Sequence, residues 1–391
     1  MSSDIKSLVG QKLDVKIEKL AVGGSGIARH RFLERDIVVF VPLTAPGDVA
    51  QIKILSIEKT FLTGELVKII EPSPHRRTPP CPVADRCGGC SWQQVVEAEQ
   101  VQQKELILTD LLQKFLKETP YVLQPSVVGK KRLNYRNRIQ LKRLGNAFGY
   151  FEKGSHNIVD IDFCPIADEK INEQIPRLKN ELKPSEQIKK YELKINQEGQ
   201  FEHYPIGESG EGLSFAQVNT EINDLLVQKT VSAITAYKPT NITELFAGAG
   251  NFTFQLAQAL PESKINAVEL NSNLTKYGVE KVKALKLQKR LTFFTADCVQ
   301  YCKSMPLSND VVLIDPPRSG CDRTILQKIA LNPPRSLVYV SCHPVNLVRD
   351  LAYLKTAVST NRPLQIKWLQ IYDMFPQTDH FETLCIIEFP S

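Results

Sequence analysis

The feature that most constrains the fold is an alternation of helix-length and strand-length segments that begins near Leu213 and continues to the last residues. Helical patterns, such as the segment 272–287, separate short apolar runs such as INAVEL and SLVYVS. This alternation is typical of a mostly parallel sheet with helices packed on both faces. We therefore expect a doubly wound, Rossmann-like α/β domain that ends in a final pair of strands.

Glycine and acidic residues follow the first three predicted strands of this domain. The first strand runs into GAGN at 248–251, the second ends in Glu269 and the third ends in Asp297. A glycine turn lets the backbone approach a nucleotide, Glu269 could accept both ribose hydroxyls, and Asp297 could meet an adenine amino group. The spacing is not the GxGxxG of dinucleotide sites, so S-adenosylmethionine is favoured over NAD; a mere tight turn is the alternative.

A cysteine stands where the fifth predicted strand stops. In LVYVSCHPVNL, Cys342 follows the strand and Pro344 prevents the strand from continuing, while VVLIDPPRSG places Asp315 and Arg318 after the fourth strand. Because parallel strands share one carboxyl edge, we expect these residues to border the same crevice. A buried cysteine that fills a core gap is the ordinary alternative. Its position at this edge favours a functional thiol.

A thiolate in such a crevice can activate a pyrimidine base. Addition of sulfur to C6 makes C5 nucleophilic enough to take a methyl group from a sulfonium donor, and a base must then remove the C5 proton. His380 and Glu382, in YDMFPQTDHFE, are candidate bases that would share one face of a strand. An ordinary surface pair is the alternative. The target base would have to leave its stack to reach the thiol.

The first half of the chain carries features of nucleic-acid binding. Residues 12–70 contain short strand-like runs separated by glycine turns, which predicts an OB-like β-barrel. A proline-rich segment, 71–82, follows it, and helical patterns are expected at 92–117 and 167–182. The segment from Lys130 to Lys153 contains eight Lys or Arg residues, one acidic residue and several interleaved aromatic residues. Cations can neutralise RNA phosphates and aromatic rings can stack on bases, so this composition favours RNA binding. A solvated basic face is the alternative.

Four cysteines suggest a metal site. Cys81, Cys87 and Cys90 follow C-x5-C-x2-C, and Cys164 lies before a proline in DFCPIAD. By count, four thiolates suit zinc and an iron–sulfur cluster equally well, and unliganded thiols are the alternative. The sequence shows no secretory signal and no apolar run near the ~20 residues that span a bilayer. We therefore expect a cytoplasmic protein with reduced cysteines and no membrane partner.

These motifs together resemble the S-adenosylmethionine-dependent RNA uracil-5-methyltransferase family over nearly the whole chain. DPPRSG, the sixteen residues Cys321–Ser336 and LVYVSC are similar to its nucleophile signature, and YDMFPQTDHFE is similar to its base signature. The resemblance implies that Cys342 is the nucleophile and Glu382 the proton-abstracting base. The methyl donor would be contacted by Gln217, Phe246, Asn251, Glu269, Asp297 and Asp315. His343 and Asn346 depart from the usual Asn and Thr, which concerns the shape of the uracil pocket.

The N-terminal half resembles the ribosomal branch of this family. VGGSGIAR and VVFVPLTAPGD are similar to its TRAM RNA-binding module. The resemblance implies that a 4Fe-4S cluster, in preference to zinc, is held in a structural role by Cys81, Cys87, Cys90 and Cys164. RNA contacts are expected from Arg132, Arg136 and Arg138. The last two lie two residues apart on a predicted strand and should face RNA together.

The predicted organisation has three domains. They are a TRAM-like barrel at 1–72, a central α+β iron–sulfur and RNA-binding domain at 73–93 and 120–205, and a methyltransferase domain at 94–119 and 206–391. We expect a monomer that methylates C5 of a uridine in 23S ribosomal RNA through a cysteine–C6 adduct. The T-loop of transfer RNA is an alternative substrate, and a non-catalytic RNA-binding protein is an alternative function. Cytosine-5 methylation is disfavoured because Arg318, not cysteine, follows Pro317.

Overall fold

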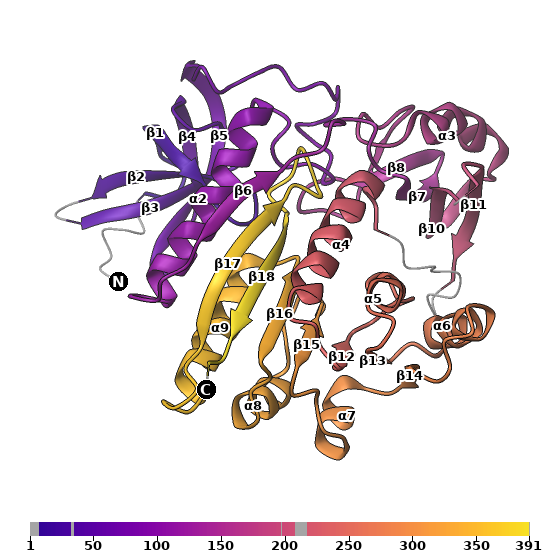
Figure 1. Ribbon diagram of the computed structural model, residues 1–391. Coiled ribbons are helices and arrows are strands. Elements are labelled where there is room, and N and C mark those ends of the chain that lie inside the picture. The colour runs from indigo at the N-terminus through magenta and orange to yellow at the C-terminus, as the bar shows by residue number, and fades with distance from the viewer. Residues whose placement is uncertain (1–7, 33–34, 197, 208–216, 391) are drawn as a thin grey trace. The chain divides into compact units, whose positions relative to one another are not determined.

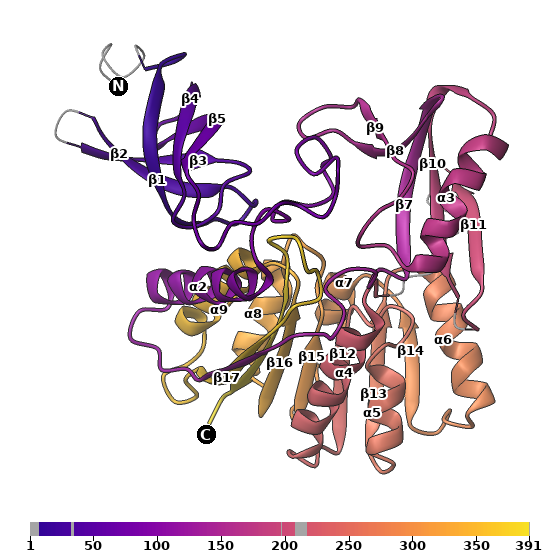
Figure 2. The ribbon, with the colours of Figure 1, turned by 90° about the horizontal axis from the view of Figure 1, so that it is seen from above.

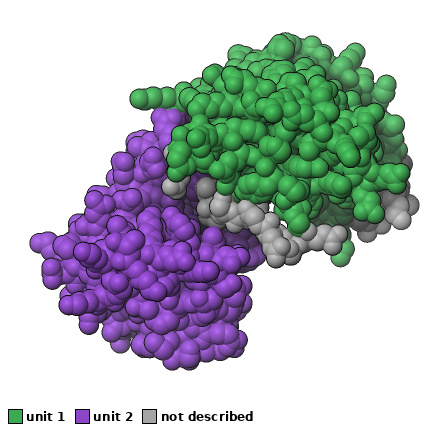
Figure 3. Space-filling view, turned by 90° about the vertical axis from the view of Figure 1, so that its right-hand side faces the viewer, with its two compact units in different colours: residues 1–107, 130–213, 375–380 green, residues 108–129, 214–374, 381–391 purple. Residues whose placement is uncertain are grey.

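The computed structural model describes residues 8–32, 35–196, 198–207 and 217–390. The chain divides into two compact units, which are coloured separately in Figure 3. Unit 1 comprises Met1–Ile107, Lys130–Leu213 and Phe375–His380, and unit 2 comprises Leu108–Gly129, Ser214–Met374 and Phe381–Ser391. Unit 1 therefore holds both the barrel and the central sheet, and the predicted three-domain boundaries stay a prediction.

The N-terminal part of unit 1 is a closed five-stranded barrel with strand order β1-β2-β3-β5-β4 (Figure 1). Its strands are β1 (Lys12–Leu20), β2 (Gly26–Phe32), β3 (Arg35–Val41), β4 (Val49–Ile57) and β5 (Phe61–Glu71). Alternate apolar residues such as Ile17, Val39 and Ile52 point inward and are almost fully buried. Period-two alternation thus places one face of each strand in the barrel core, and the predicted barrel is confirmed.

The rest of unit 1 is built on a five-stranded sheet with order β11-β10-β7-β8-β9. Its elements are β7 (Arg138–Gly145), β8 (Ala147–Phe151), β9 (Ile158–Asp160), α3 (Glu169–Glu181), β10 (Ser185–Ile195) and β11 (Phe201–Ile206). Asp168 caps α3 by accepting from the Lys170 amide. The buried face of α3, with Ile171, Ile175 and Leu178, joins the same apolar core as the sheet.

Two expectations about unit 1 are wrong in detail. Helix α2 (Glu97–Phe115) begins five residues after Trp92, because the Trp92 amide donates to the Gln377 carbonyl and its indole donates to the Gly24 carbonyl. Arg136 does not lie on the strand that carries Arg138. Its amide donates to the Ile166 carbonyl, so β7 begins only at Arg138.

Unit 2 contains an eight-stranded sheet with order β14-β13-β12-β15-β16-β18-β17-β6, and helices lie on both of its sides (Figure 2). Its strands are β6 (Leu123–Val127), β12 (Asn241–Leu245), β13 (Lys264–Glu269), β14 (Leu291–Thr295), β15 (Val311–Ile314), β16 (Ser336–Ser341), β17 (Gln365–Tyr372) and β18 (Glu382–Glu388). Its other helices are α4 (Thr220–Thr235), α5 (Thr253–Ala259), α6 (Ser272–Ala284), α7 (Cys298–Ser304), α8 (Arg323–Leu331) and α9 (Pro344–Ala357).

The strand order of unit 2 creates a switch point between β12 and β15. The chain builds β12, β13 and β14 outward, then returns to add β15 and β16 on the other side of β12. These five strands are parallel, and β18 pairs antiparallel with β16. Ligands of doubly wound sheets bind beyond the carboxyl ends of the strands at such a point. The predicted α/β domain with its final strand pair is confirmed.

No helix in the described ranges is both long enough and apolar enough to cross a membrane.

Candidate active site and cysteine pocket

Three predicted site residues come from neighbouring strands at the carboxyl edge of the unit 2 sheet. Asp315 follows β15, Cys342 follows β16 and Glu382 opens β18. Ser341 pairs with Thr383 in the antiparallel register, so Cys342 and Glu382 stand at adjoining strand ends. The charges of Glu382 and Asp315 both raise the pKa of Cys342, so the three groups lie within electrostatic range of one another. The fold therefore brings together residues that are separated by up to sixty-seven positions in the sequence.

Burial governs the protonation of this group. It raises the pKa of Cys342 to about 12, with the charges of Glu382 and Asp315 adding to the rise and Arg318 opposing it. Burial also raises the pKa of Asp315 to about 7, and that of Glu382 well above its usual range. In this state the thiol and Glu382 favour their neutral forms. A base with a raised pKa is suited to receive a proton during the reaction.

Glu382 also carries an unsatisfied oxygen. Its side chain is 4% exposed, and Oε2 has no hydrogen-bond partner in the described part of the chain. Buried polar atoms are nearly always paired, so an unpaired carboxyl oxygen beside a thiol marks a place where a ligand atom can bind. The predicted pairing of His380 with Glu382 on one strand is wrong, because β18 begins at Glu382.

The loop that carries Asp315 and Arg318 is tied to helix α9, which starts directly after Cys342. Asn346 Nδ2 donates to the Arg318 carbonyl at 2.5 Å, and an Arg349 guanidinium nitrogen donates to the Ser319 carbonyl at 3.1 Å. The buried Asp350 accepts from the Cys321 amide at 2.8 Å. These bonds fix the loop that carries Arg318 to helix α9, which follows Cys342.

The two departures from the family pattern therefore have structural roles. His343 is the N-cap of α9, where its Nδ1 accepts from the Asn346 amide at 3.4 Å. Asn346 makes the bond to the Arg318 loop described above. The sequence placed Arg318 beside the crevice and Asn346 near the uracil pocket, but it gave neither the bond between them nor the contact made by Asp350. The only available signal was the placement of DPPRSG at a strand end, because the partners on α9 depend on packing across the sheet edge.

The glycine turn after β12 adopts the conformation that its residues predict. Gly250 has φ of +90°, and a Cβ there would lie 2.5 Å from the Phe254 ring, so glycine is required. Phe246 also has a positive φ, 63°, and such strain in a bulky residue often marks a ligand site. Glu269 Oε2 accepts from the Gly248 amide at 2.9 Å, which joins the ends of β12 and β13.

The other predicted donor residues lie around this turn, with one exception. Asn251 exchanges two side-chain hydrogen bonds with Asn223 on α4. Asp297 is exposed after β14 and caps α7 by accepting from the Val299 and Gln300 amides. Gln217 lies just before α4, and the preceding part of its motif, 214–216, falls outside the described residues.

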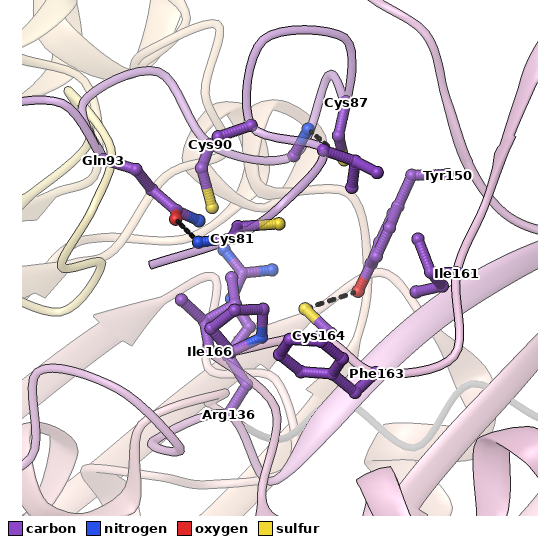
Figure 4. Close-up of a pocket in the computed structure, with 14 residues that line it drawn as sticks. Cys81, Cys87, Cys90, Gln93, Arg136, Tyr150, Ile161, Phe163, Cys164 and Ile166 are labelled. Carbon is purple, nitrogen blue, oxygen red and sulfur yellow. Dashed lines mark hydrogen bonds between the residues drawn. The ribbon is translucent and has the colours of Figure 1, made fainter. Parts of the chain in front are cut away.

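All four predicted metal ligands line a single pocket in unit 1 (Figure 4). The pocket is otherwise mostly apolar, with walls formed by Val83, Ala84, Ile161, Phe163 and Ile166. Two donors point at sulfur: the Gly89 amide lies 3.4 Å from Cys87 Sγ, and the Tyr150 hydroxyl lies 3.7 Å from Cys164 Sγ. Donors to sulfur and a dry surrounding are typical of sites that hold iron–sulfur clusters, so the residues fit such a group.

Burial disfavours the thiolate form of three thiols in this pocket. Burial raises the pKa of Cys81 and Cys87, and it raises that of Cys90 to about 12. Among the described residues, no three His, Cys, Asp or Glu side chains are gathered closely enough to hold a single metal ion. The four thiols surround the pocket without meeting at one point.

The three predicted RNA-binding arginines do not share one exposed surface. The Arg132 side chain is 12% exposed and lies 3.9 Å from Glu97, and Arg138 is 16% exposed and lies 3.6 Å from the buried Glu192. Arg136 lines the cysteine pocket. The expectation that Arg136 lies on the same strand as Arg138 is therefore wrong, because Arg136 precedes β7. RNA contacts by all three arginines stay predictions.

The comparisons with known proteins agree with this arrangement. Residues 193–388 match the tRNA (uracil-5-)-methyltransferase family model, and residues 6–67 match the TRAM domain. An uncharacterized RNA methyltransferase of Bdellovibrio bacteriovorus is 37% identical over 98% of this chain and 97% of its own length. The 23S rRNA (uracil(1939)-C(5))-methyltransferase RlmD of Shewanella amazonensis is 28% identical over 97% of this chain and 96% of its length.

A solved structure shows the same fold. The Pyrococcus abyssi tRNA (uracil-54, C5)-methyltransferase, in complex with S-adenosyl-L-homocysteine, superimposes with a TM-score of 0.69. It is 21% identical and covers 96% of this chain and 100% of its own. The chain belongs to the RNA uracil-5-methyltransferase family and carries an N-terminal TRAM domain. It is a methyltransferase.

Proposed function

We propose that this protein transfers a methyl group from S-adenosylmethionine to C5 of a uridine in 23S ribosomal RNA. The observation that carries the proposal is the meeting of Cys342, Glu382 and Asp315 at one sheet edge, with an unpaired Glu382 oxygen beside the thiol. The full-length similarity to the Shewanella amazonensis RlmD supports the ribosomal substrate. Transfer RNA is the alternative substrate, supported by the description of the matching family model.

The reaction would proceed through a covalent bond between Cys342 and the base. Cys342 Sγ loses its proton to solvent water and the thiolate attacks C6, and the electrons of the C5–C6 double bond move toward C5 and the O4 carbonyl. The bound donor supplies an electrophilic methyl group to C5. Glu382, in its carboxylate form, then takes the C5 proton. The C5–H electrons re-form the C5–C6 double bond, and the C6–S bond breaks with its electrons returning to sulfur as thiolate. Arg318 is the nearby cation that favours the thiolate.

The donor would bind at the carboxyl edge of β12, β13 and β14. Glu269 would accept ribose hydroxyls, Asp297 is exposed at the third strand end, and Phe246 and Asn251 flank the glycine turn. Asp315 would act at the border between donor and target base. Gln217 would contribute from the segment before α4.

A 4Fe-4S cluster on Cys81, Cys87, Cys90 and Cys164 is the second part of the proposal. The single mostly apolar pocket lined by the four thiols supports it (Figure 4). When bound, the cluster would supply cross-links between the segment that holds Cys81, Cys87 and Cys90 and the loop that holds Cys164. Its role in this proposal is structural. A monomeric state and a cytoplasmic location remain predictions.

The test is to map 5-methyluridine in ribosomal and transfer RNA by mass spectrometry, with and without the gene. We expect the loss of one or more 5-methyluridines from 23S ribosomal RNA and their return with the wild-type gene. A Cys342→Ala gene should not restore them. Loss confined to transfer RNA would select the alternative substrate, and restoration by Cys342→Ala would reject the covalent mechanism.

A further inference from the structure

Arg136 is a partly buried cation in the wall of the cysteine pocket (Figure 4). Its guanidinium carbon lies 5.9 Å from the centres of the Tyr135 and Phe375 rings, and Nε donates to the Tyr135 hydroxyl at 3.4 Å. In the described part of the chain, no carboxylate lies within ion-pair distance of this side chain. A guanidinium removed from water is costly without a counter-charge.

Two lysines of the same basic segment also lie within electrostatic range of these cysteines. Lys142 Nζ sits over the Tyr150 and Phe151 rings, at 5.7 and 5.1 Å, and interacts with Cys87. Lys153 Nζ donates to the Ala84 carbonyl at 3.0 Å and interacts with Cys87 and Cys90. Arg136, Lys142 and Lys153 all belong to the basic segment from Lys130 to Lys153, for which the composition predicted RNA binding.

Among the described residues, Asp85 is an acid within electrostatic range of both Cys81 and Lys153. One carboxylate does not balance the charges of Arg136, Lys142 and Lys153. A 4Fe-4S core carries fewer positive charges than its four thiolate ligands carry negative ones, so the whole group is anionic. An anionic cluster in the pocket would therefore complete the charge balance that the protein alone leaves open.

We propose that Arg136 is the counter-ion of an anionic metal–thiolate cluster held by Cys81, Cys87, Cys90 and Cys164. This inference rests on the cluster in the proposed function, not on the methylation chemistry. A fixed positive charge stabilises the thiolate ligands against loss of the metal. It also favours the reduced cluster, because reduction adds a negative charge, so Arg136 raises the reduction potential.

The experiment compares three variants of the full-length protein purified without oxygen. Arg136→Met removes the charge and keeps an unbranched side chain, whereas Arg136→Lys keeps the charge. Arg177→Met is the matched control: it removes an exposed arginine of α3 whose partner is Glu181. The measurements are iron and sulfide per chain, the rate of iron loss to a chelator, and the midpoint potential in a dithionite titration followed by electron paramagnetic resonance.

We expect Arg136→Met to lose iron about tenfold faster than wild type and to have a more negative midpoint potential. The iron-loss rate and midpoint potential of Arg136→Lys should lie between those of wild type and Arg136→Met. Both quantities should equal the wild-type values in Arg177→Met. Equal iron loss and equal potential in Arg136→Met would overturn the inference. Purified wild type with zinc or no metal would also overturn it. Continued uridine methylation in that case would leave the proposed reaction standing, so the two failures are distinguishable.

Discussion

Cys342 and the four cysteines of the pocket, Cys81, Cys87, Cys90 and Cys164, lie in electrostatic surroundings of opposite sign. Cys342 faces two carboxyl groups, Glu382 and Asp315, with Arg318 as the opposing cation. The four-cysteine pocket is instead surrounded by Arg136, Lys142 and Lys153. Burial raises the pKa of Cys342 and of Cys81, Cys87 and Cys90 alike, so burial does not distinguish the two sites.

The difference follows from what each sulfur has to do. A nucleophile must bond to carbon and then leave it, so its thiolate should be accessible but not too stable. Nearby carboxyl groups keep the thiolate from becoming too stable, and one of them can also accept the C5 proton. A metal ligand must stay a thiolate permanently, and fixed cations lower the cost of that buried charge. The predictions below are designed to separate these two roles.

The largest effect is expected from Cys342→Ala. Methyl transfer should fall by about 10⁴-fold or more, because C5 of uracil is not nucleophilic without the C6 adduct. Iron content should equal that of wild type, since Cys342 does not line the cysteine pocket. Transfer of a labelled methyl group to RNA, together with iron analysis, measures both. Substantial residual methylation would contradict the assignment of the nucleophile.

The next largest effect is expected from Glu382→Gln. Turnover should fall by about 10²- to 10⁴-fold, because no base removes the C5 proton. The amide keeps the shape of the side chain, so the covalent intermediate should form and persist. A denaturing gel should show a slow-migrating protein–RNA band that is absent from Cys342→Ala. Glu382→Gln without any such band would remove Glu382 from the role of base.

Methyl transfer should depend on pH in the direction set by buried acids. Burial raises the pKa of Asp315 to about 7, so its carboxylate is depleted below that pH. Because Asp315 would act in its ionised form, the rate should fall by about tenfold per unit below pH 7 and level off above it. Single-turnover rates between pH 5.5 and about pH 9 would show the slope. A rate that increased on acidification would contradict this role for Asp315.

A smaller effect is expected from Asn346→Ala. Loss of the bond to the Arg318 carbonyl should loosen the loop and lower kcat by about fivefold, with little change in melting temperature. Thr356→Ala, at an exposed position of the same helix, is the control. Initial rates and thermal melting measure the two quantities. Equal losses in both variants would show that α9 acts through general stability and not through this contact.

Sequence reasoning reached those features that depend on where strands end. Cys342 and Asp315 follow buried strands, and the parallel order of a doubly wound sheet predicts their shared edge. Glu382 opens the antiparallel strand β18, and it was identified through its motif and the family resemblance. The barrel was equally accessible, because its alternating pattern directly reflects burial.

The positions of Arg136 and of the α9 contacts could not be predicted in this way. Arg136 departs from the strand pattern because its amide bonds to Ile166, thirty positions away, and no local pattern encodes such a bond. The basic segment therefore looked uniform in sequence, although Arg136 turns toward thiols. The Asn346 contact likewise joins residues that meet only once the sheet has formed.

The most direct test of the central claim is peptide mapping of the protein after reaction with substrate RNA that contains 5-fluorouridine. A base can remove a proton from C5 but cannot remove fluorine from it. The covalent adduct should therefore be trapped after methyl transfer. We predict that the RNA fragment is attached to Cys342 and that Cys81, Cys87, Cys90 and Cys164 carry none. Attachment to another cysteine, or methylation without any trapped adduct, would contradict the account.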